Sequence, residues 1–390
     1  MSAIAAMSRE RWAMSVEARA LAVLTAGLTV LGLAFLYSAS AIVALQNDQP
    51  SWSFVARQGA GVLAGIVVFA IAAKLDAEQL QRYAWPLVFL TVALMLVTVL
   101  PFTESIAPMR NGSRRFIFGA SIQPSELGKV AVVIWTAMLV VKKGDKLRRL
   151  TKGLLPFLVV VGVLDLLAIL QPDLSVAMMY TLIMGVVLFS GGARIGHFVV
   201  LGIIAIPLLW SQIVKLQYAL ARLFSFFGVG DAPATIAYQL KQSLIAVGSG
   251  GLLGQGFGQG RQQFGFVPLG YNDFIASTIG EEWGFAGMVL IVGLYALYGW
   301  LGMRIARQAR SPFLQLVAVG LTLTMVITAF VHIGVVIGLL PTTGLTLPFV
   351  SYGRSNLLLS FLISGILVNI GSRREHVVGA GGRHLVAVPA

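Results

Sequence analysis

The sequence predicts an all-α fold, a polytopic membrane bundle of about ten transmembrane helices. Composition is the first reason: 57% of the residues are hydrophobic and 11% are charged, whereas a soluble domain carries roughly 25% charged residues. The second reason is the pattern, because apolar runs of about 20 residues recur along the chain between polar connections. The mean hydropathy of +0.87 agrees with a chain whose main solvent is lipid.

The apolar runs define the predicted spans in chain order. The first run is too long for a cleaved signal peptide, and its flanks lack a small-residue cleavage site, so we expect it to remain as an anchor. Each run is long enough to cross a bilayer as a helix. The predicted spans are residues 18–40, 53–73, 83–102, 125–141, 153–170, 174–191, 195–213, 274–300, 312–333 and 353–371.

Lysine and arginine predict the orientation. Of the 28 Lys and Arg residues, 18 fall on the side that holds both termini, and the positive-inside rule makes that side cytoplasmic. The rest lie outside or within spans, against the rule, and invite a functional explanation. They are Arg57, Arg110, Arg114, Arg115, Lys129, Lys215, Arg222, Lys241, Arg261 and Arg354.

Three long connections, residues 103–124, 214–273 and 334–352, share the outer side and are rich in Gly, Pro and polar residues. The middle one exceeds ordinary connection length, and loops this long are usually functional or disordered. We expect one transmembrane domain over residues 1–371, with an extracytoplasmic loop at 214–273. Residues 372–390 are predicted to form a flexible cytoplasmic tail.

Several function classes are excluded by residue usage. The chain has no cysteine, which rules out disulfides and thiolate metal sites. Its four histidines lack the spacing of a zinc protease. The net charge of +13 resides mainly in short connections rather than on an amphipathic face, so no nucleic-acid partner is expected.

The first polar motif is Gln123-Pro-Ser-Glu126, with Lys129 one helical turn further on. Pro124 and Glu126 suit the first turn of a helix. Capping does not explain Lys129, because an unpaired ammonium inside an apolar span costs several kcal/mol. The spacing leaves two readings: a structural Glu126–Lys129 pair, or a role at the edge of a substrate cavity.

The second motif is Gln171-Pro-Asp173, at an outer junction between two spans. Pro172 breaks the helix, and capping of the next helix is the expected role of Asp173. Asp165 lies deeper, within a span, where a carboxylate needs a partner or a proton. Arg57 is the candidate partner.

The third stretch holds the glycine runs Gly248-Ser-Gly-Gly251 and Gly254-Gln-Gly-Phe-Gly-Gln-Gly260. No strand–turn–helix unit or Walker lysine accompanies them, so they do not predict a nucleotide site. They favour tight turns and close backbone approach. Asp273 follows at the mouth of the predicted eighth span, either as a helix cap or as a carboxylate with a chemical role.

The fourth stretch, residues 338–354, is punctuated by Pro and Gly at membrane depth or just above it. Irregular backbone is tolerated there only when it is buried in protein or lines a cavity. A cavity wall is therefore expected.

Together these motifs resemble the SEDS family, which includes FtsW, RodA and SpoVE. The likeness is carried by Gln123-Pro-Ser-Glu126 with Lys129, Gln171-Pro-Asp173, Gly248-Ser-Gly-Gly251, Asn272-Asp-Phe-Ile275 with Gly280-Glu-Glu282, and Leu347-Pro-Phe-Val-Ser-Tyr-Gly353. They occur in the family's order over nearly the whole chain. Ile279-Gly-Glu-Glu282 and Gly344-Leu-Thr-Leu-Pro348 are more similar to FtsW than to RodA.

The resemblance implies a SEDS fold and an inverting peptidoglycan glycosyltransferase that polymerises lipid II, an undecaprenyl-pyrophosphate-linked disaccharide. It implies the bacterial cytoplasmic membrane as location, an extracytoplasmic active face, and a class B penicillin-binding protein, a transpeptidase, as partner within the division or elongation machinery. No cofactor is certain, although a divalent cation, Mg or Mn, is an option beside the pyrophosphate. The alternatives are a RodA-like elongation polymerase, a lipid II flippase and a transpeptidase scaffold.

The family's catalytic aspartate maps onto Asp273. Five of the cations that break the positive-inside pattern are expected to stabilise the departing pyrophosphate: Arg114, Arg115, Lys129, Lys241 and Arg354. The expected substrate-binding residues are Arg114, Arg115, Glu126, Lys129, Asp173, Lys241, Gln242, Ser243, Ser351, Tyr352 and Arg354.

The sequence departs from the family pattern at four positions: Phe116 replaces the usual Trp, His332 the common Asn, and Arg354 and Asn356 parts of a Gly-Gly-Ser-Ser run. Arg354 adds a cation beside the expected cavity, where it serves either as a phosphate ligand or as a partner of a local carboxylate.

Overall fold

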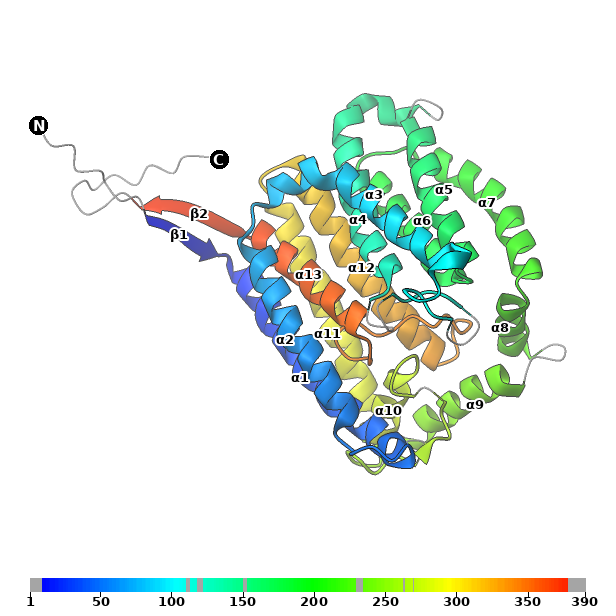
Figure 1. The fold of residues 1–390 in the computed structure, drawn as a ribbon. Helices are drawn as coiled ribbons and strands as arrows, with labels where there is room; N and C mark the ends of the chain where they lie inside the picture. The colour runs from blue at the N-terminus through cyan, green and yellow to red at the C-terminus, as the bar shows by residue number, and fades with distance from the viewer. Residues whose placement is uncertain are drawn as a thin grey trace, which may run out of the picture.

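The computed structural model is a bundle of long, mostly antiparallel helices (Figure 1). It describes residues 9–109, 113–117, 122–149, 153–228, 234–261, 264–268 and 270–377. The long helices are α1 (Val16–Gln46), α2 (Ser53–Lys74), α3 (Leu80–Val99), α4 (Pro124–Lys143), α5 (Leu155–Leu170), α6 (Leu174–Ser190), α7 (Ile195–Lys215), α11 (Gly284–Arg307), α12 (Pro312–Val336) and α13 (Arg354–Ile370).

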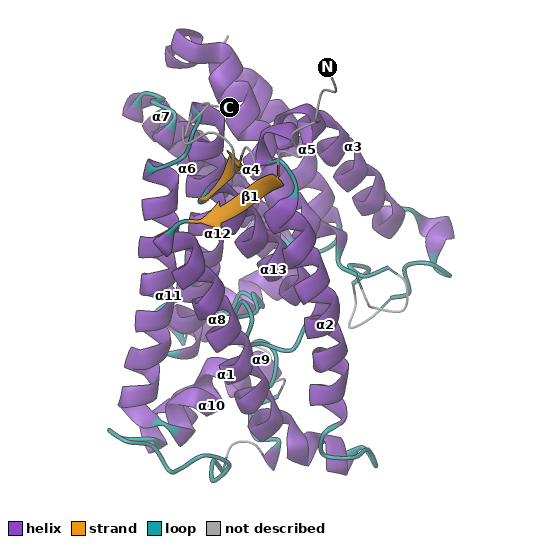
Figure 2. Ribbon diagram, turned by 90° about the vertical axis from the view of Figure 1, so that its left-hand side faces the viewer, coloured by secondary structure: helices purple, strands orange, loops and turns teal. Residues whose placement is uncertain are grey.

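Shorter elements complete the fold. The short helices are α8 (Gln217–Phe227), α9 (Ala234–Ser249) and α10 (Ile275–Glu282), with single 3-10 turns at Ala77–Gln79, Pro101–Thr103 and Gly144–Arg148. The strands β1 (Arg9–Met14) and β2 (Ser372–Val377) pair antiparallel, with Arg9 opposite Val377 and Met14 opposite Ser372. Figure 2 shows this ribbon at one end of the bundle, called here the strand end; the other is the site end.

The helices confirm the predicted membrane bundle. Six of the described helices are long and apolar enough to cross a bilayer, and α5, α6 and α13 are shorter apolar helices. With α7 they match the ten predicted spans in order. The chain is a multi-pass membrane protein.

Local sequence explains where several helices begin. Pro124 occupies the first turn of α4 with Glu126, while Lys142 and Lys143 close the helix, a charge order that complements the helix dipole. Ser311 caps α12 by accepting a hydrogen bond from the Leu314 amide, directly before Pro312.

The core lies between α4, α6 and α12. In α4, 83% of the most apolar window is buried, against 17% in α2, so α4 is central and α2 peripheral. Helices α2 and α13 nevertheless pack closely, because a methyl group on Gly365 would lie 2.7 Å from the Phe69 carbonyl oxygen. Helices α7, α8 and α9 form an arc along one side (Figure 1).

The predicted span 274–300 is wrong as a single helix. It is divided into α10 and α11, because Gly284 takes a positive φ of 62° where the glycine-rich segment packs against the chain. A methyl group on Gly284 would lie 2.4 Å from the Gly254 amide nitrogen. Only one residue separates the two helices, so a hydropathy window does not detect the break.

Two further features add to the predicted outline. The long connection 214–273 contains α8 and α9. The segment predicted as a tail begins with β2, while residues 378–390 lie outside the described residues.

Candidate active site

Asp273 lies directly before α10, on a segment held by hydrogen bonds from the 351–352 turn. The Ser351 hydroxyl donates to the Asn272 carbonyl at 2.7 Å, and the Tyr352 amide donates to the Tyr271 carbonyl at 3.0 Å. Phe274 is the N-cap residue of α10, and no side chain caps that helix. Helix capping therefore does not explain why an aspartate occupies position 273.

Opposing effects act on the pKa of Asp273. Burial raises the pKa of Asp273 to about 6; the Arg222 and Arg115 guanidinium groups pull it down, and the neighbouring Asp173 carboxylate pushes it up. The carboxylate is thus held close to two cations in a water-poor setting. Its proton affinity is poised near neutral pH, as a general base requires.

Arg222 is the site residue to which the sequence assigned no role. It extends from α8, and its Nη1 donates to the Thr343 carbonyl at 3.0 Å, an oxygen that also accepts from the Ser175 hydroxyl at 2.8 Å. One carbonyl thereby joins α8, the start of α6 and the 337–353 connection. Arg222 lies outside every matched motif, so its only sequence signal was a positive charge against the topology.

Arg115 and Asp173 form an ion pair at the site end. Arg115 Nη1 lies 3.3 Å from Asp173 Oδ2, and its other nitrogens donate to the Gln171 and Pro172 carbonyls at 3.2 and 2.6 Å. Asp173 also caps α6 by accepting from the Val176 amide at 3.3 Å. The predicted cap is confirmed, and burial raises the pKa of Asp173.

The glycine-rich segment supports this region through its backbone. The Gln255 and Gly256 amides donate to the Glu281 and Glu282 carbonyls at 2.9 and 3.0 Å. A methyl group on Gly254, whose φ is 85°, would lie 2.0 Å from the Glu282 carbonyl oxygen. The predicted close backbone approach is confirmed.

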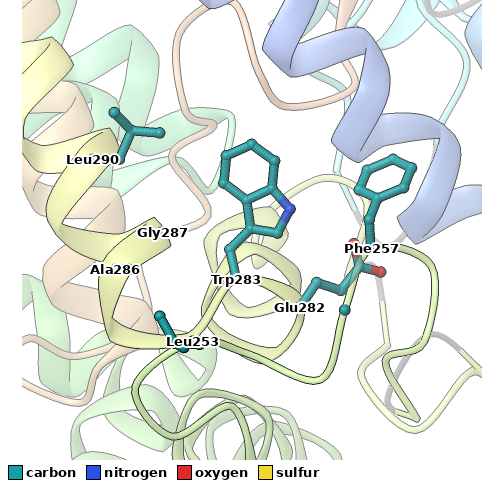
Figure 3. A pocket seen from close by; sticks show the side chains of 8 residues that line it. Leu253, Phe257, Glu282, Trp283, Ala286, Gly287 and Leu290 are labelled. Atoms are coloured by element: carbon teal, nitrogen blue, oxygen red, sulfur yellow. The ribbon is translucent and has the colours of Figure 1, made fainter.

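A separate pocket opens beside this segment (Figure 3). Its volume is about 430 Å³, and Leu253, Phe257, Glu282, Trp283 and Leu290 are among its walls. The Ser38 hydroxyl of α1 donates to the Glu282 carboxylate, and this hydrogen bond joins α1 to the α10–α11 turn near the site end. Asp273 is not among the residues that line this pocket.

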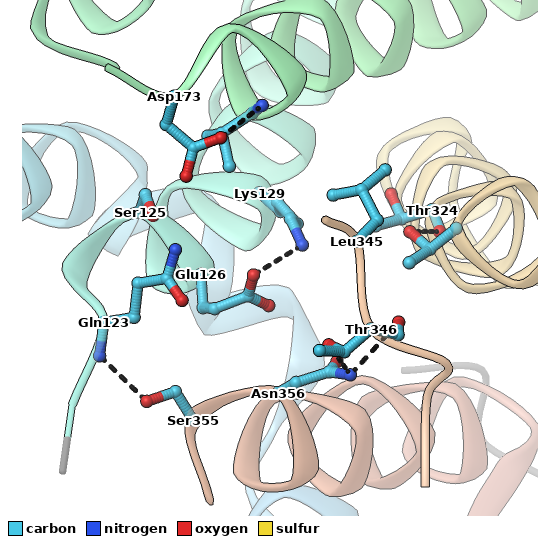
Figure 4. Close-up of polar contacts among 12 residues, drawn as sticks. Gln123, Ser125, Glu126, Lys129, Asp173, Thr324, Leu345, Thr346, Ser355 and Asn356 are labelled. Carbon is cyan, nitrogen blue, oxygen red and sulfur yellow. Dashed lines mark hydrogen bonds and ion pairs between the residues drawn. The ribbon is translucent and has the colours of Figure 1, made fainter. Parts of the chain in front are cut away.

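Glu126 and Lys129 form the predicted pair. Their Oε1 and Nζ atoms are 2.7 Å apart, and both side chains are buried (Figure 4). Glu126 Oε2 has no hydrogen-bond partner among the described residues. The same view shows a second polar tie, in which Asn356 donates to the Thr346 hydroxyl at 2.6 Å.

The irregular 337–353 connection is held by side chains. His332 Nδ1 lies 2.8 Å from the Leu345 carbonyl, and the Leu347 amide donates to the Ser351 hydroxyl at 2.8 Å. Phe349 has a φ of 65°, a costly left-handed conformation for a bulky residue. The expected cavity wall stays a prediction; at Gly344 this backbone lies next to Asp273.

Several of the other predicted substrate-binding residues have their contacts away from Asp273. Arg114 turns to the Leu100 carbonyl and the Glu104 carboxylate. Ser243 is buried, and its hydroxyl donates to the Val336 carbonyl at 2.9 Å, packing α9 on α12. Lys241 and Arg354 are exposed.

Gln242 is half-buried in α9, one residue from Ser243. Ser351 and Tyr352, by contrast, hold the Asp273 segment directly. The geometry therefore brings Arg115, Asp173, Ser351 and Tyr352 to the surroundings of Asp273, and adds Arg222.

The expected Arg57–Asp165 pair is wrong. Asp165 Oδ2 accepts from the Thr181 hydroxyl at 2.7 Å, which links α5 to α6, whereas Arg57 donates to Gln49 at 3.0 Å. Arg57 lies in the second turn of α2, close to the connection that precedes this helix, where the Gln49 amide oxygen accepts its hydrogen bond in place of a carboxylate.

The fold and the site define a polytopic helical membrane protein with a half-buried carboxylate and two nearby arginines at one end of the bundle. The chain belongs to the cell cycle protein family of FtsW, RodA and SpoVE, whose model matches residues 19–376.

Known relatives support this family assignment. A probable peptidoglycan glycosyltransferase FtsW of Geobacter sulfurreducens is 35% identical over 348 residues, covering 89% of this chain and 92% of that protein. Stage V sporulation protein E of Bacillus subtilis is 37% identical over 352 residues, covering 90% and 95%.

Solved structures share the fold. A chain of a peptidoglycan synthase complex superposes with a TM-score of 0.72 at 24% identity, covering 90% of this chain and 97% of that one. The rod shape determining protein RodA of Thermus thermophilus gives a TM-score of 0.63 at 25% identity, covering 90% and 95%.

Proposed function

We propose that the chain is a peptidoglycan glycosyltransferase that polymerises lipid II, with Asp273 as general base. The relatives named as such at 35% identity over most of the chain support the activity. The observation that carries the residue assignment is the setting of Asp273, which is half-buried, lies within reach of the charges of Arg222 and Arg115, and has a pKa raised to about 6.

Forming a β-1,4 bond from an α-linked donor inverts the anomeric carbon. The acceptor hydroxyl oxygen attacks that carbon, Asp273 takes the hydroxyl proton, and the bond to the pyrophosphate breaks. A carboxylate with a pKa near 6 is largely ionised at neutral pH and still basic enough to accept the proton. One carboxylate suffices for this step.

The leaving pyrophosphate accumulates negative charge that fixed cations stabilise. Arg115 and Arg222 are the cations whose charges reach Asp273. Lys129 is already paired with Glu126. It therefore contributes a buried polar pair near the site rather than a free ammonium that binds phosphate. Arg114, Glu126, Lys241, Gln242, Ser243 and Arg354 remain substrate-binding proposals that no contact with Asp273 supports.

A divalent cation beside the pyrophosphate would take most of its ligands from the substrate. Among the described residues, no three His, Asp or Glu side chains gather as a metal-binding group.

Orientation follows from the charge pattern. The strand end carries the Arg- and Lys-rich connections and is assigned to the cytoplasm, with both termini, so the site end faces outward across the bacterial cytoplasmic membrane. The undecaprenyl tail can then remain in the bilayer while its head group enters the site end.

A class B penicillin-binding protein, a transpeptidase, is the proposed partner, because glycan polymerisation must be coordinated with cross-linking. A relative of the same fold comes from a peptidoglycan synthase complex. The FtsW-named relatives favour septal synthesis during division over a RodA-like role in elongation.

The test is reconstitution of the purified chain with its transpeptidase and labelled lipid II. Glycan strands should form only when the chain is present. Transfer of lipid II across vesicles without strand formation would instead indicate a flippase, and strand formation by the transpeptidase preparation alone would indicate a scaffold.

A further inference from the structure

Three aromatic side chains cluster beside Asp273. Phe54 lies at the start of α2, Tyr271 precedes Asp273 by two residues, and Tyr352 precedes α13. The ring centroids are 4.9 Å apart for Phe54 and Tyr271, 5.3 Å for Phe54 and Tyr352, and 6.0 Å for the two tyrosines. All three side chains are half-buried, so part of each ring remains accessible.

The backbone beneath these rings is fixed. Gln58, only 1% exposed, donates to the Ser351 carbonyl at 3.1 Å and accepts from the Gly353 amide at 3.3 Å. The Tyr352 amide donates to the Tyr271 carbonyl at 3.0 Å. The two tyrosines are thus held in one rigid unit with the Asp273 segment.

The tyrosine hydroxyls, in contrast, make no hydrogen bond to any of the residues described. A buried or half-buried tyrosine hydroxyl usually finds a partner. Burial raises the pKa of Tyr271, and the charges of Tyr352 and Asp273 raise it further. Two tyrosine rings are therefore fixed through their backbone on the segment that carries Asp273.

Interfacial aromatic belts offer the ordinary explanation, since Trp and Tyr anchor membrane proteins at the head-group level. Trp52, which is 61% exposed, suits that role. The three clustered rings do not, because they contact one another and one of them is tied to the carboxylate segment.

We propose that Phe54, Tyr271 and Tyr352 form a saccharide-binding platform that positions a pyranose ring of the glycan next to Asp273. A pyranose presents C–H groups on its faces and hydroxyls around its rim, which matches accessible ring surface bordered by free phenol hydroxyls. A prenyl chain would leave both hydroxyls unpaired. A phosphate would be held by a cation rather than by ring faces, and the Arg57 guanidinium, 5.8 Å from the Phe54 ring centroid, already donates to Gln49. The platform deepens the proposed function and rests on it for the identity of the sugar.

The probe is a short β-1,4-linked oligosaccharide of the peptidoglycan disaccharide, without lipid or pyrophosphate. Saturation-transfer NMR with the full chain in nanodiscs should show transfer to the pyranose C–H protons. Tyr271→Leu and Tyr352→Leu should abolish the transfer. Tyr83→Leu, at an exposed tyrosine near the strand end of α3, is the matched control and should bind like the wild type.

The phenylalanine variants keep the rings and remove only the hydroxyls, so they test the proposal even if a leucine variant fails to fold. Tyr271→Phe and Tyr352→Phe should each weaken binding about five-fold, the usual effect of losing one hydrogen bond. Transfer unchanged in all four platform variants would overturn the proposal.

The Asp273→Asn variant separates this proposal from the proposed function. It should bind the oligosaccharide like the wild type, since the platform needs no base. Retained binding with retained polymerisation would contradict the role of Asp273 alone. Loss of polymerisation together with wild-type binding by the platform variants would contradict the platform alone.

Discussion

Asp273 and Arg222 meet at Gly344. A methyl group on Gly344 would lie 3.8 Å from Asp273 Oδ2 and 3.6 Å from Arg222 Nη2. Both side chains therefore lie against the 337–353 connection at Gly344, whose positive φ of 77° favours glycine at this position.

The first prediction concerns pH. A general base acts in its ionised form, and burial raises the pKa of Asp273 from 3.8 to about 6. Protonation as the pH falls through about 6 should therefore reduce the polymerisation rate, approaching ten-fold per pH unit well below that value. Initial rates of lipid II polymerisation, measured against pH, give this acid limb of the pH–rate profile. A rate that stays constant well below pH 6 would contradict a base with this pKa.

The second prediction concerns Arg222. Its positive charge lowers the pKa of Asp273, so Arg222→Gln should move the acid limb of the pH–rate profile to higher pH. Lys142→Gln removes one positive charge from the exposed strand end of α4 and is the matched control. If both variants leave the limb where it is, Arg222 does not act on Asp273.

The family resemblance singled out Asp273, whereas the sequence assigned Arg222 no role, and the reason for that difference is physical. Short motifs carry information about residues whose local backbone is constrained, such as Asp173 at its helix cap. Arg222 reaches the site from α8 through a tertiary contact with Thr343, which no sequence spacing encodes.

The helical spans were predictable because apolar length alone decides them. The break between α10 and α11 was not, because it depends on Gly254 packing against Gly284 from a distant segment. The sequence likewise does not distinguish Arg114 from its neighbour Arg115, and the structure shows that Arg114 pairs with Glu104.

The third prediction tests the Glu126–Lys129 pair as a structural element. Lys129→Met should leave the Glu126 carboxylate buried without its partner and lower the free energy of unfolding by about 3 kcal/mol. The double variant Lys129→Met with Glu126→Gln should recover most of that loss, because no buried charge remains. Unfolding in mixed micelles measures both. Additive losses would show that the two side chains do not depend on each other.

The fourth prediction compares two glycines. Gly254→Ala forces a methyl group onto the Glu282 carbonyl at a φ of 85° and should destabilise the protein by at least 1–3 kcal/mol, roughly the strain of that backbone. Gly248→Ala meets nothing within 4 Å and lies in α9, so it should be neutral or slightly stabilising. Thermal unfolding of the two variants should shift in opposite directions or differ clearly; equal shifts would argue against close packing at Gly254.

The most direct test of the central claim is the rate at which purified Asp273→Asn, with its transpeptidase, polymerises lipid II. Asparagine keeps the size of the side chain and removes the base, so we expect glycan synthesis to disappear while folding and complex formation remain as in the wild type. Glycan synthesis at the wild-type rate in this variant would contradict the assignment of Asp273 as the general base.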